Sequence, residues 1–426
     1  MAKITLKDLS HSYLTKQSND ADWALRGVNI DWKDGGAYAL LGPSGCGKTT
    51  LLNIISGLLK PTKGEILFND KNVTNLNPVE RDIAQIFQFP VIYDTMTVYD
   101  NLAFPLKNRG LSKTEIDSKV KEIGEMLELT STLNNKAAGL TADGKQKISL
   151  GRGLVRSDVN VIMFDEPLTV IDPHLKWVLR SKLKELHQKI NRTMIYVTHD
   201  QIEALTFADE VVVMHEGQIV QTGTPVELFE KPKHTFVGHF IGSPGMNILP
   251  CKIENGQINF EGKIIPNNNS IKKINYNKTQ LGIRPEFIKF SNDGIKVKIK
   301  RVSDTGRHKV IDTECSSGSI KILANASTEI PSDSAHITFD KKYISIVLII
   351  SSKTSTMNDP LTSLQMAGLV ASGVVLLLLA CAFDYAYKIC WCASLPCQGI
   401  YVCCNKMKYS DDDEGVCCRC DGHCVV

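Results

Sequence analysis

Apolar runs and helical stretches alternate along the first 236 residues of the chain. Four runs rich in aliphatic residues predict strands, at residues 37–41, 159–164, 194–197 and 210–214. Apolar residues recur at helical spacing at 48–56 and 175–190, which predicts helices. Apolar strands that alternate with helices are typical of a parallel sheet covered on both faces. We therefore predict an α/β domain with a parallel-sheet core over residues 1–236.

The pattern changes from residue 237 onward. Short strand-like pieces at 252–253, 257–260 and 262–265 are separated by Asn and Gly turns, including three successive asparagines at 267–269. Short strands between turn residues predict a small all-β domain, which we place at residues 237–350.

A third pattern occupies residues 351–426. Residues 364–383 form a 20-residue stretch whose only strongly polar member is Gln365. A helix of that length crosses a hydrocarbon core of about 30 Å, so we predict a transmembrane helix there. Ten of the 13 cysteines follow residue 380, together with an acidic run at 411–414.

The overall composition is that of a globular protein, with 43% hydrophobic and 22% charged residues. The net charge of +3 gives no sign of nucleic-acid binding. The N-terminus carries no apolar segment of the secretory type, and no internal repeat is visible. Composition thus excludes a wholly disordered chain, and nucleic acid is not an expected partner.

A phosphate-binding loop is predicted directly after the strand at 37–41. The segment from Gly42 to Thr49 fits G-x-x-x-x-G-K-[ST] and opens the helix at 48–56, which is the context that this motif requires. Backbone N–H groups of such a loop surround phosphate oxygens, the lysine reaches the terminal phosphates, and the hydroxyl after it ligates Mg²⁺. The predicted ATP-binding residues are Gly42, Pro43, Ser44, Gly45, Cys46, Gly47, Lys48, Thr49 and Thr50.

An acidic pair ends the strand at 159–164. Asp165 and Glu166 lie where an α/β sheet places its ligands, at the carboxyl end of a strand. We expect Asp165 to hold the Mg²⁺ and Glu166 to polarise the attacking water. An acidic pair after a strand is weak evidence for a nucleotide site by itself, but it is strong evidence when a phosphate loop is also present.

Four further segments distinguish this chain from other proteins with a phosphate-binding loop. Gln88 in QIFQFP, residues 140–152 (LTADGKQKISLGR), Asp172 in LTVID and His199 in YVTHD have the order and spacing of ATP-binding-cassette (ABC) transporter subunits, which residues 1–235 resemble. Residues 93–106, 242–247 (GSPGMN) and 281–286 (LGIRPE) resemble the carbohydrate and polyol importers of that family. The resemblance implies a P-loop NTPase cassette followed by an OB-like transport-associated (TOBE) domain.

The resemblance also implies roles for individual residues. Tyr13 would stack on adenine, Gln88 would sense Mg²⁺ and water and touch the membrane subunit, and Asp172 would shape the dimer seam. His199 would contact the γ-phosphate. The alternatives are an ordinary core tyrosine for Tyr13 and a buried structural histidine for His199.

The signature segment departs from the family pattern. It is normally Leu-Ser-Gly-Gly-Gln and caps the ATP of a partner subunit; here it is Leu140, Thr141, Ala142, Asp143 and Gly144. Side chains replace two glycines that allow backbone contact with phosphate, and Asp143 adds negative charge. Because the signature acts on the ATP of the partner subunit, a homodimer would carry this defect at both of its ATP sites. We therefore favour a heterodimer with a second ATPase.

These features predict an ATP-hydrolysing subunit of an ABC importer for a sugar, glycerol or a related polyol. The narrower resemblance is to one member of a paired-ATPase glycerol importer. The expected partners are ABC permease subunits and, indirectly, a periplasmic solute-binding protein, with the chain peripheral on the cytoplasmic face of the inner membrane. The alternatives are a subunit that binds ATP but scarcely hydrolyses it, and a non-transport ABC ATPase.

The C-terminal segment has three interpretations. It could be a functional anchor with acylated cysteines, or a metal site built on Cys417, Cys420 and Cys424 beside His423. It could also be a foreign segment joined to the ATPase near residues 350–357, which is the leading interpretation.

Overall fold

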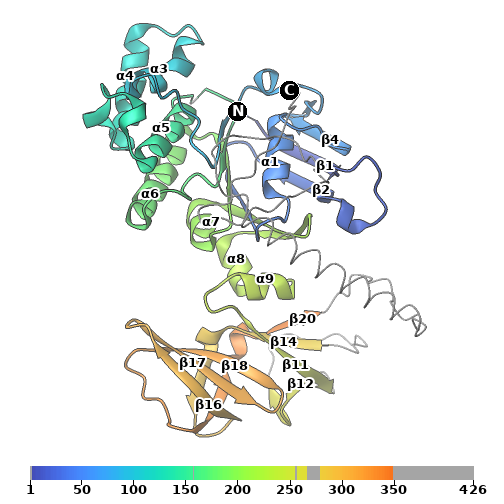
Figure 1. Cartoon of the computed structure of the whole chain (residues 1–426). Helices are drawn as coiled ribbons and strands as arrows, with labels where there is room; N and C mark the ends of the chain where they lie inside the picture. The colour runs from blue at the N-terminus through green and yellow to red at the C-terminus, as the bar shows by residue number, and fades with distance from the viewer. Residues whose placement is uncertain (1, 157, 255–256, 266–278, 349–426) are drawn as a thin grey trace, which may run out of the picture. The chain divides into compact units, whose positions relative to one another are not determined.

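A computed structural model of the protein describes residues 2–156, 158–254, 257–265 and 279–348 (Figure 1). The predicted transmembrane helix at 364–383 and the cysteine-rich segment lie outside these residues. Within the described part of the chain, none of the helices combines the length and the apolar character needed to cross a membrane.

The centre of the first domain is a six-stranded sheet with the order β10-β9-β3-β8-β7-β6. Its strands run parallel except β10, which pairs antiparallel with β9. Strands β3, β7 and β8 are buried along their whole length, as a parallel sheet covered on both faces requires. The bounds are β3 Ala37–Leu41, β6 Ile83–Ile86, β7 Val161–Asp165, β8 Thr193–Thr198, β9 Glu210–His215 and β10 Gln218–Gly223. The predicted parallel core is confirmed.

Two hydrophobic clusters cover the two faces of this sheet. Ala37 and Ala39 of β3 pack with the helices α3 to α7, whereas Tyr38 and Leu40 pack with α1. Figure 1 shows α3 to α6 gathered on one side and α1 beside β1, β2 and β4 on the other. The bounds are α1 Lys48–Ser56, α2 Pro78–Arg81, α3 Val98–Lys107, α4 Lys113–Met126, α5 Ala142–Leu154, α6 Pro173–Ile190, α7 Gln201–Phe207, α8 Pro225–Glu230 and α9 Thr235–Phe240.

A second sheet of the first domain was not predicted. It is antiparallel, with the order β2-β1-β4-β5, and shares a hydrophobic cluster with α1. Its first strand buries only part of its residues, because one face of the sheet meets the core and the other meets solvent. The bounds are β1 Ile4–His11, β2 Leu25–Trp32, β4 Lys63–Phe68 and β5 Lys71–Asn72.

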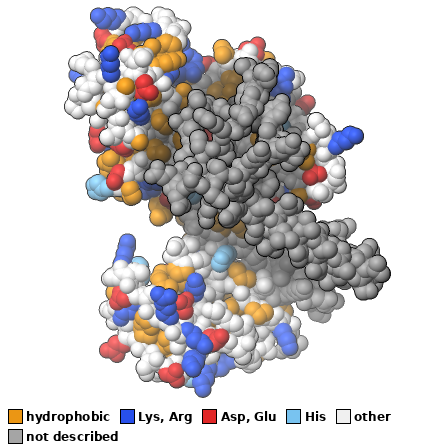
Figure 2. Space-filling view, in the orientation of Figure 1, with side chains coloured by type: hydrophobic (Ala, Val, Ile, Leu, Met, Phe, Trp, Pro, Cys, Tyr) orange, Lys and Arg blue, Asp and Glu red, His pale blue; other side chains and the backbone are white. Residues whose placement is uncertain are grey.

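The second domain is all-β, as predicted. Two five-stranded antiparallel sheets, β13-β12-β11-β14-β20 and β15-β19-β16-β17-β18, enclose one hydrophobic cluster. Strand β19 buries every second residue, and Figure 2 shows charged side chains scattered over the visible face of this domain. The bounds are β11 Asn247–Glu254, β12 Gln257–Phe260, β13 Lys263–Ile265, β14 Thr279–Ile283, β15 Ile288–Ser291, β16 Ile295–Asp304, β17 His308–Cys315, β18 Gly318–Asn325, β19 Ser334–Phe339 and β20 Ser345–Leu348.

Arg284, directly after β14, fastens this domain to the segment α8–α9. Its buried guanidinium donates to the carbonyl oxygen of Phe229 at 2.6 Å and to that of Ile241. It also stacks on the Phe229 ring, 3.9 Å from the ring centre. Burial lowers the pKa of Arg284 to about 10. The carbonyl groups take the place of a carboxylate partner.

Candidate nucleotide-binding site

The loop between β3 and α1 has a shape that only glycine permits at several positions. Gly45 and Gly47 have φ of +80° and +99°, in the left-handed region. A Cβ on Gly42 would lie 2.3 Å from the carbonyl oxygen of Met214, and one on Gly47 would lie 2.6 Å from that of Ala24. Gly42 and Gly47 therefore leave no room for a side chain between the loop and these neighbouring backbone segments.

Lys48 and Cys46 are buried at the base of this loop, whereas Ser44 and Gly45 are exposed at its tip. The Lys48 ammonium donates to the carbonyl oxygens of Gly42 and Pro43, each at 2.9 Å. The Cys46 Sγ lies 3.9 Å from the same nitrogen, and burial raises the pKa of the Cys46 thiol. The cation thus lies inside the loop that would surround phosphate oxygens.

Thr49 and Asp165 bring two oxygen ligands together. The Thr49 hydroxyl donates to the Asp165 carboxylate at 3.1 Å, across 116 residues of sequence. Burial at the end of β7 raises the pKa of Asp165; the neighbouring charge of Glu166 adds to this, and the bond from Thr49 opposes it. Hydroxyl and carboxylate oxygens are ligands that Mg²⁺ prefers, so this pair fits the cation.

Glu166 and His199 meet at the ends of β7 and β8. Glu166 has a left-handed backbone with φ of +46°, and its N–H donates to Val197 O at 2.9 Å. Its Oε2 lies 3.1 Å from Nδ1 of His199. The His199 side chain is 53% exposed, so it is not a buried structural histidine.

Tyr13 stands beside the first turn of α1. Its hydroxyl lies 3.1 Å from that of Thr50, and its ring is perpendicular to that of His11, with the ring centres 4.7 Å apart. Because Tyr13 is 66% exposed, it is not a core tyrosine. An exposed aromatic ring next to a phosphate loop is able to stack on a base.

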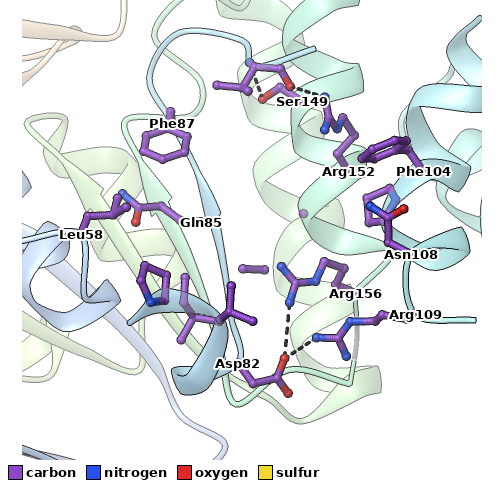
Figure 3. A pocket seen from close by; sticks show the side chains of 17 residues that line it. Leu58, Asp82, Gln85, Phe87, Phe104, Asn108, Arg109, Ser149, Arg152 and Arg156 are labelled. Carbon is purple, nitrogen blue, oxygen red and sulfur yellow. Dashed lines mark hydrogen bonds and ion pairs between the residues drawn. The ribbon is translucent and has the colours of Figure 1, made fainter. Parts of the chain in front are cut away.

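Gln88 lies half-buried in the loop after β6, between the exposed rings of Phe87 and Phe89. The neighbouring residues line a groove of about 540 Å³ between β6 and the helices α3 and α5. Figure 3 shows Phe87 on one side of this groove and Arg152 with Phe104 on the other.

Ion pairs and hydrogen bonds hold the walls of this groove. Asp82 pairs with Arg109 and, at 3.4 Å, with Arg156 (Figure 3). The Arg152 guanidinium donates to Val91 O at 2.9 Å, and Val91 N–H donates to Ser149. The groove is thus walled by ion pairs and hydrogen bonds and is otherwise lined largely by apolar residues.

The altered signature forms the start of α5. Thr141 caps the helix, its hydroxyl accepting from Gly144 N–H at 3.3 Å, and Leu140 and Ala142 flank it. Asp143 lies in the first turn, with its carboxylate 3.6 Å from Lys147 Nζ. Asp172 caps α6 by accepting from His174 N–H at 2.9 Å. Thr141 and Asp172 are thus helix N-caps, and the residues from Ala142 to Gly144 form the first turn of α5.

Gln146 was missed by the sequence analysis. It is fully buried on α5, and its Nε2 donates to Pro167 O at 2.8 Å and to Phe87 O at 3.5 Å. It thereby joins the signature helix to the residue after Glu166 and to the loop that carries Gln88. Its place two residues beyond the signature was the only signal in the sequence.

Comparisons with known proteins agree with this geometry. Residues 25–169 match the model of the ABC transporter family, and residues 242–288 match the MalK OB fold domain. The chain is 38% identical over 332 residues to the sn-glycerol-3-phosphate import ATP-binding protein UgpC of Bordetella pertussis, covering 77% of this chain and 90% of that protein. The chain belongs to the ABC transporter family.

Two further proteins are similar to this ABC subunit. UgpC of Escherichia coli strain K12 is 41% identical over 282 residues, which cover 66% of this chain and 79% of the relative. The structure of cbiO1 from Clostridium perfringens, part of the ABC transporter complex cbiONQ, aligns with a TM-score of 0.48 and 28% identity over 54% of this chain and 90% of that one.

The predicted family, the cassette with its OB-type domain and the ATPase class are therefore confirmed. The transmembrane helix predicted at 364–383 lies outside the described residues and stays a prediction. The roles of the individual site residues stay predictions.

Proposed function

We propose that this chain is the ATP-hydrolysing subunit that powers an ABC importer for sn-glycerol-3-phosphate or a related polyol or sugar. The observation that carries the proposal is the convergence of Lys48, Thr49, Asp165, Glu166 and His199 at one edge of the parallel sheet. An OB-type domain of the importer kind follows in the same chain. The solute is taken from the names of the relatives.

The chemistry follows from what each group can donate or accept. The amides of the loop and Lys48 bind the phosphate oxygens. Thr49 and Asp165, with Gln88 from its loop, would hold Mg²⁺, which neutralises charge on the transferring phosphoryl group.

Glu166 accepts a hydrogen bond from the attacking water and polarises it. His199 pairs with Glu166 through Nδ1, and its Nε2 is then able to contact the γ-phosphate. Tyr13 stacks on adenine, and Asp172 shapes the seam with the partner cassette.

The loop that carries Gln88 would transmit the conformational change of ATP hydrolysis to the membrane subunits. We infer that this loop and the adjoining groove receive a permease subunit, because movement of Gln88 with the nucleotide would shift the exposed Phe87 and Phe89. The chain would then be peripheral on the cytoplasmic face of the membrane, with a periplasmic binding protein delivering the solute to the permease.

The composition of the dimer is a separate question. A heterodimer with a second ATPase that carries an intact signature is favoured by the residues at 142 and 143 but is not supported by the comparisons. The ATPase activity of the chain purified alone tests it: full, cooperative turnover contradicts the heterodimer, and turnover that requires a second ATPase supports it.

The two alternative functions make different predictions. A subunit that scarcely hydrolyses ATP is disfavoured by the paired Glu166 and His199, and a non-transport ATPase by the OB-type domain. For the segment after residue 350, the foreign-segment interpretation predicts that deleting residues 351–426 leaves ATPase activity unchanged. An intact-mass measurement on the native protein shows whether the segment is present.

Uptake measurements test the proposed function as a whole. Cells without this gene should lose uptake of labelled sn-glycerol-3-phosphate or glycerol. The wild-type gene should restore it, and a Glu166→Gln gene expressed at the same level should not. Unchanged uptake of sugars, glycerol and glycerol phosphate in the deletion strain contradicts the proposal.

A further inference from the structure

Lys147 is a buried cation one helical turn beyond the altered signature. Its side chain is only 8% exposed, and its Nζ lies 3.6 Å from Oδ2 of Asp143, whose side chain is 29% exposed. The spacing of four residues places both on the same face of α5. The charge that the sequence analysis placed opposite a partner's phosphate is therefore paired inside this chain.

A second carboxylate keeps Lys147 in place. Glu128, just after α4, lies 3.7 Å from Lys147 Nζ and 3.0 Å from Lys182 Nζ on α6. Lys182 in turn lowers the pKa of Glu128, so this carboxylate is ionised at neutral pH. Two cations and two carboxylates thus alternate from α5 to α6, with no net charge.

Asp143 depends on Lys147 more than a surface carboxylate would. Its Oδ1 is buried and has no hydrogen-bond partner among the described residues. Removing the cation would leave a partly buried carboxylate unpaired in the first turn of α5, which is the arrangement that most strongly opposes an incoming phosphate.

We propose that Lys147 is a positioning residue that neutralises Asp143, so that the first turn of α5 still receives the terminal phosphate of ATP bound to a second copy of this chain. The proposal rests on the proposed function, because it needs two cassettes that close on ATP. On this proposal the altered signature still contacts the partner's ATP. Two copies of this chain could then form the ATP-bound dimer without a second ATPase.

Lys145 provides a matched control on the same helix. It lies two residues before Lys147 and pairs with Asp94 at 2.8 Å, away from Asp143. Lys145→Met therefore removes the same charge and a more exposed ion pair while leaving Asp143 paired with Lys147.

The test uses full-length protein in a Glu166→Gln background, in which ATP is held without turnover. Dimer formation is followed by sedimentation as MgATP is titrated, and ATP binding by a fluorescent ATP analogue. The chain alone should dimerise with ATP. Lys147→Met should raise the ATP concentration for half-maximal dimerisation about 10-fold, whereas Lys147→Arg and Lys145→Met should leave it unchanged.

The decisive variant is Asp143→Gly combined with Lys147→Met, which should dimerise as well as Asp143→Gly alone. If Lys147→Met weakens dimerisation equally in both backgrounds, Lys147 is merely structural and the proposal is overturned. ATP binding without dimerisation of the parent chain also overturns it, in favour of a second ATPase. Failure to bind ATP at all contradicts the proposed function instead. Thermal melting of each variant identifies any that fails to fold.

Discussion

The first turns of α1 and α5 are the two helix N-termini to which we assign phosphate binding, but different parts of the chain shape them. At α1 the backbone does so, because Gly47 is the N-cap and no side chain caps the helix. At α5 side chains do so, because Thr141 caps the helix and Asp143 lies within its first turn. If both ends bind phosphate as we propose, backbone geometry preserves the anion-binding capacity at α1 and the pairing of Asp143 with Lys147 preserves it at α5.

This difference predicts which positions at the N-termini of α1 and α5 tolerate substitution. In the phosphate loop a Cβ on Gly42 or Gly47 would collide with a backbone carbonyl oxygen, so neither position accepts a side chain without a shift of the backbone. At the signature, two positions that are glycine in the family already carry side chains, Ala142 exposed and Asp143 half-buried. The predictions below test this contrast, starting with the largest effect.

Glu166→Gln should reduce ATP turnover by about 10²–10⁴-fold, because an amide cannot accept the proton of the attacking water. ATP binding should be preserved, since the phosphate loop is untouched. Steady-state hydrolysis and ATP-analogue binding measure the two effects. Glu185→Gln, on the exposed face of α6, is the control and should change neither. Unchanged turnover in Glu166→Gln removes this residue from its catalytic role.

Gly47→Ala should weaken ATP binding at least about 10-fold and destabilise the fold by about 1–3 kcal/mol, because it forces a side chain into a left-handed backbone conformation against Ala24 O. The matched control is Gly139→Ala, just before the signature, where a Cβ meets open space. That variant should bind ATP normally and melt at the wild-type temperature. Equal effects of the two substitutions would remove the contrast between the loops.

The sequence predicts the parts of this molecule that depend on local pattern. Strand β3 and helix α1 have the predicted bounds because the motif between them is local and its glycines are diagnostic. The antiparallel sheet was missed because partly buried strands such as β1 lack the continuous apolar runs that revealed the parallel core.

Contacts across the fold escape prediction for a different reason. The spacing of Asp143 and Lys147 is visible in the sequence, but the burial of Lys147 depends on how α5 packs against α4 and α6. The contact of Gln146 with Pro167 joins residues 21 apart that no local pattern relates. Tyr13 illustrates the converse, since only the structure decides between an exposed ring and a core tyrosine.

Gln146→Leu should lower turnover about 10-fold with a smaller effect on ATP binding, because Pro167 O, next to Glu166, loses its hydrogen-bond donor. Such a split between turnover and binding distinguishes misplacement of Glu166 from damage to the phosphate loop. Gln188→Leu on the exposed face of α6 serves as the control and should behave as wild type. A parallel loss of binding and turnover would mean that Gln146 supports the whole cassette.

The smallest effect is expected at the cap of α5. Thr141→Ala removes the acceptor for Gly144 N–H, which costs about 1 kcal/mol and should weaken ATP-driven dimerisation in the Glu166→Gln background about 5-fold. Thr141→Ser keeps the oxygen and should restore it. Thr97 caps α3 in the same way, accepting from Asp100 N–H at 3.0 Å. Thr97→Ala should therefore lower the melting temperature by about as much as Thr141→Ala does, but leave dimerisation unchanged. If both alanine variants weaken dimerisation alike, the cap of α5 acts through overall stability alone, and the first turn of α5 owes its role to the pairing of Asp143 rather than to Thr141.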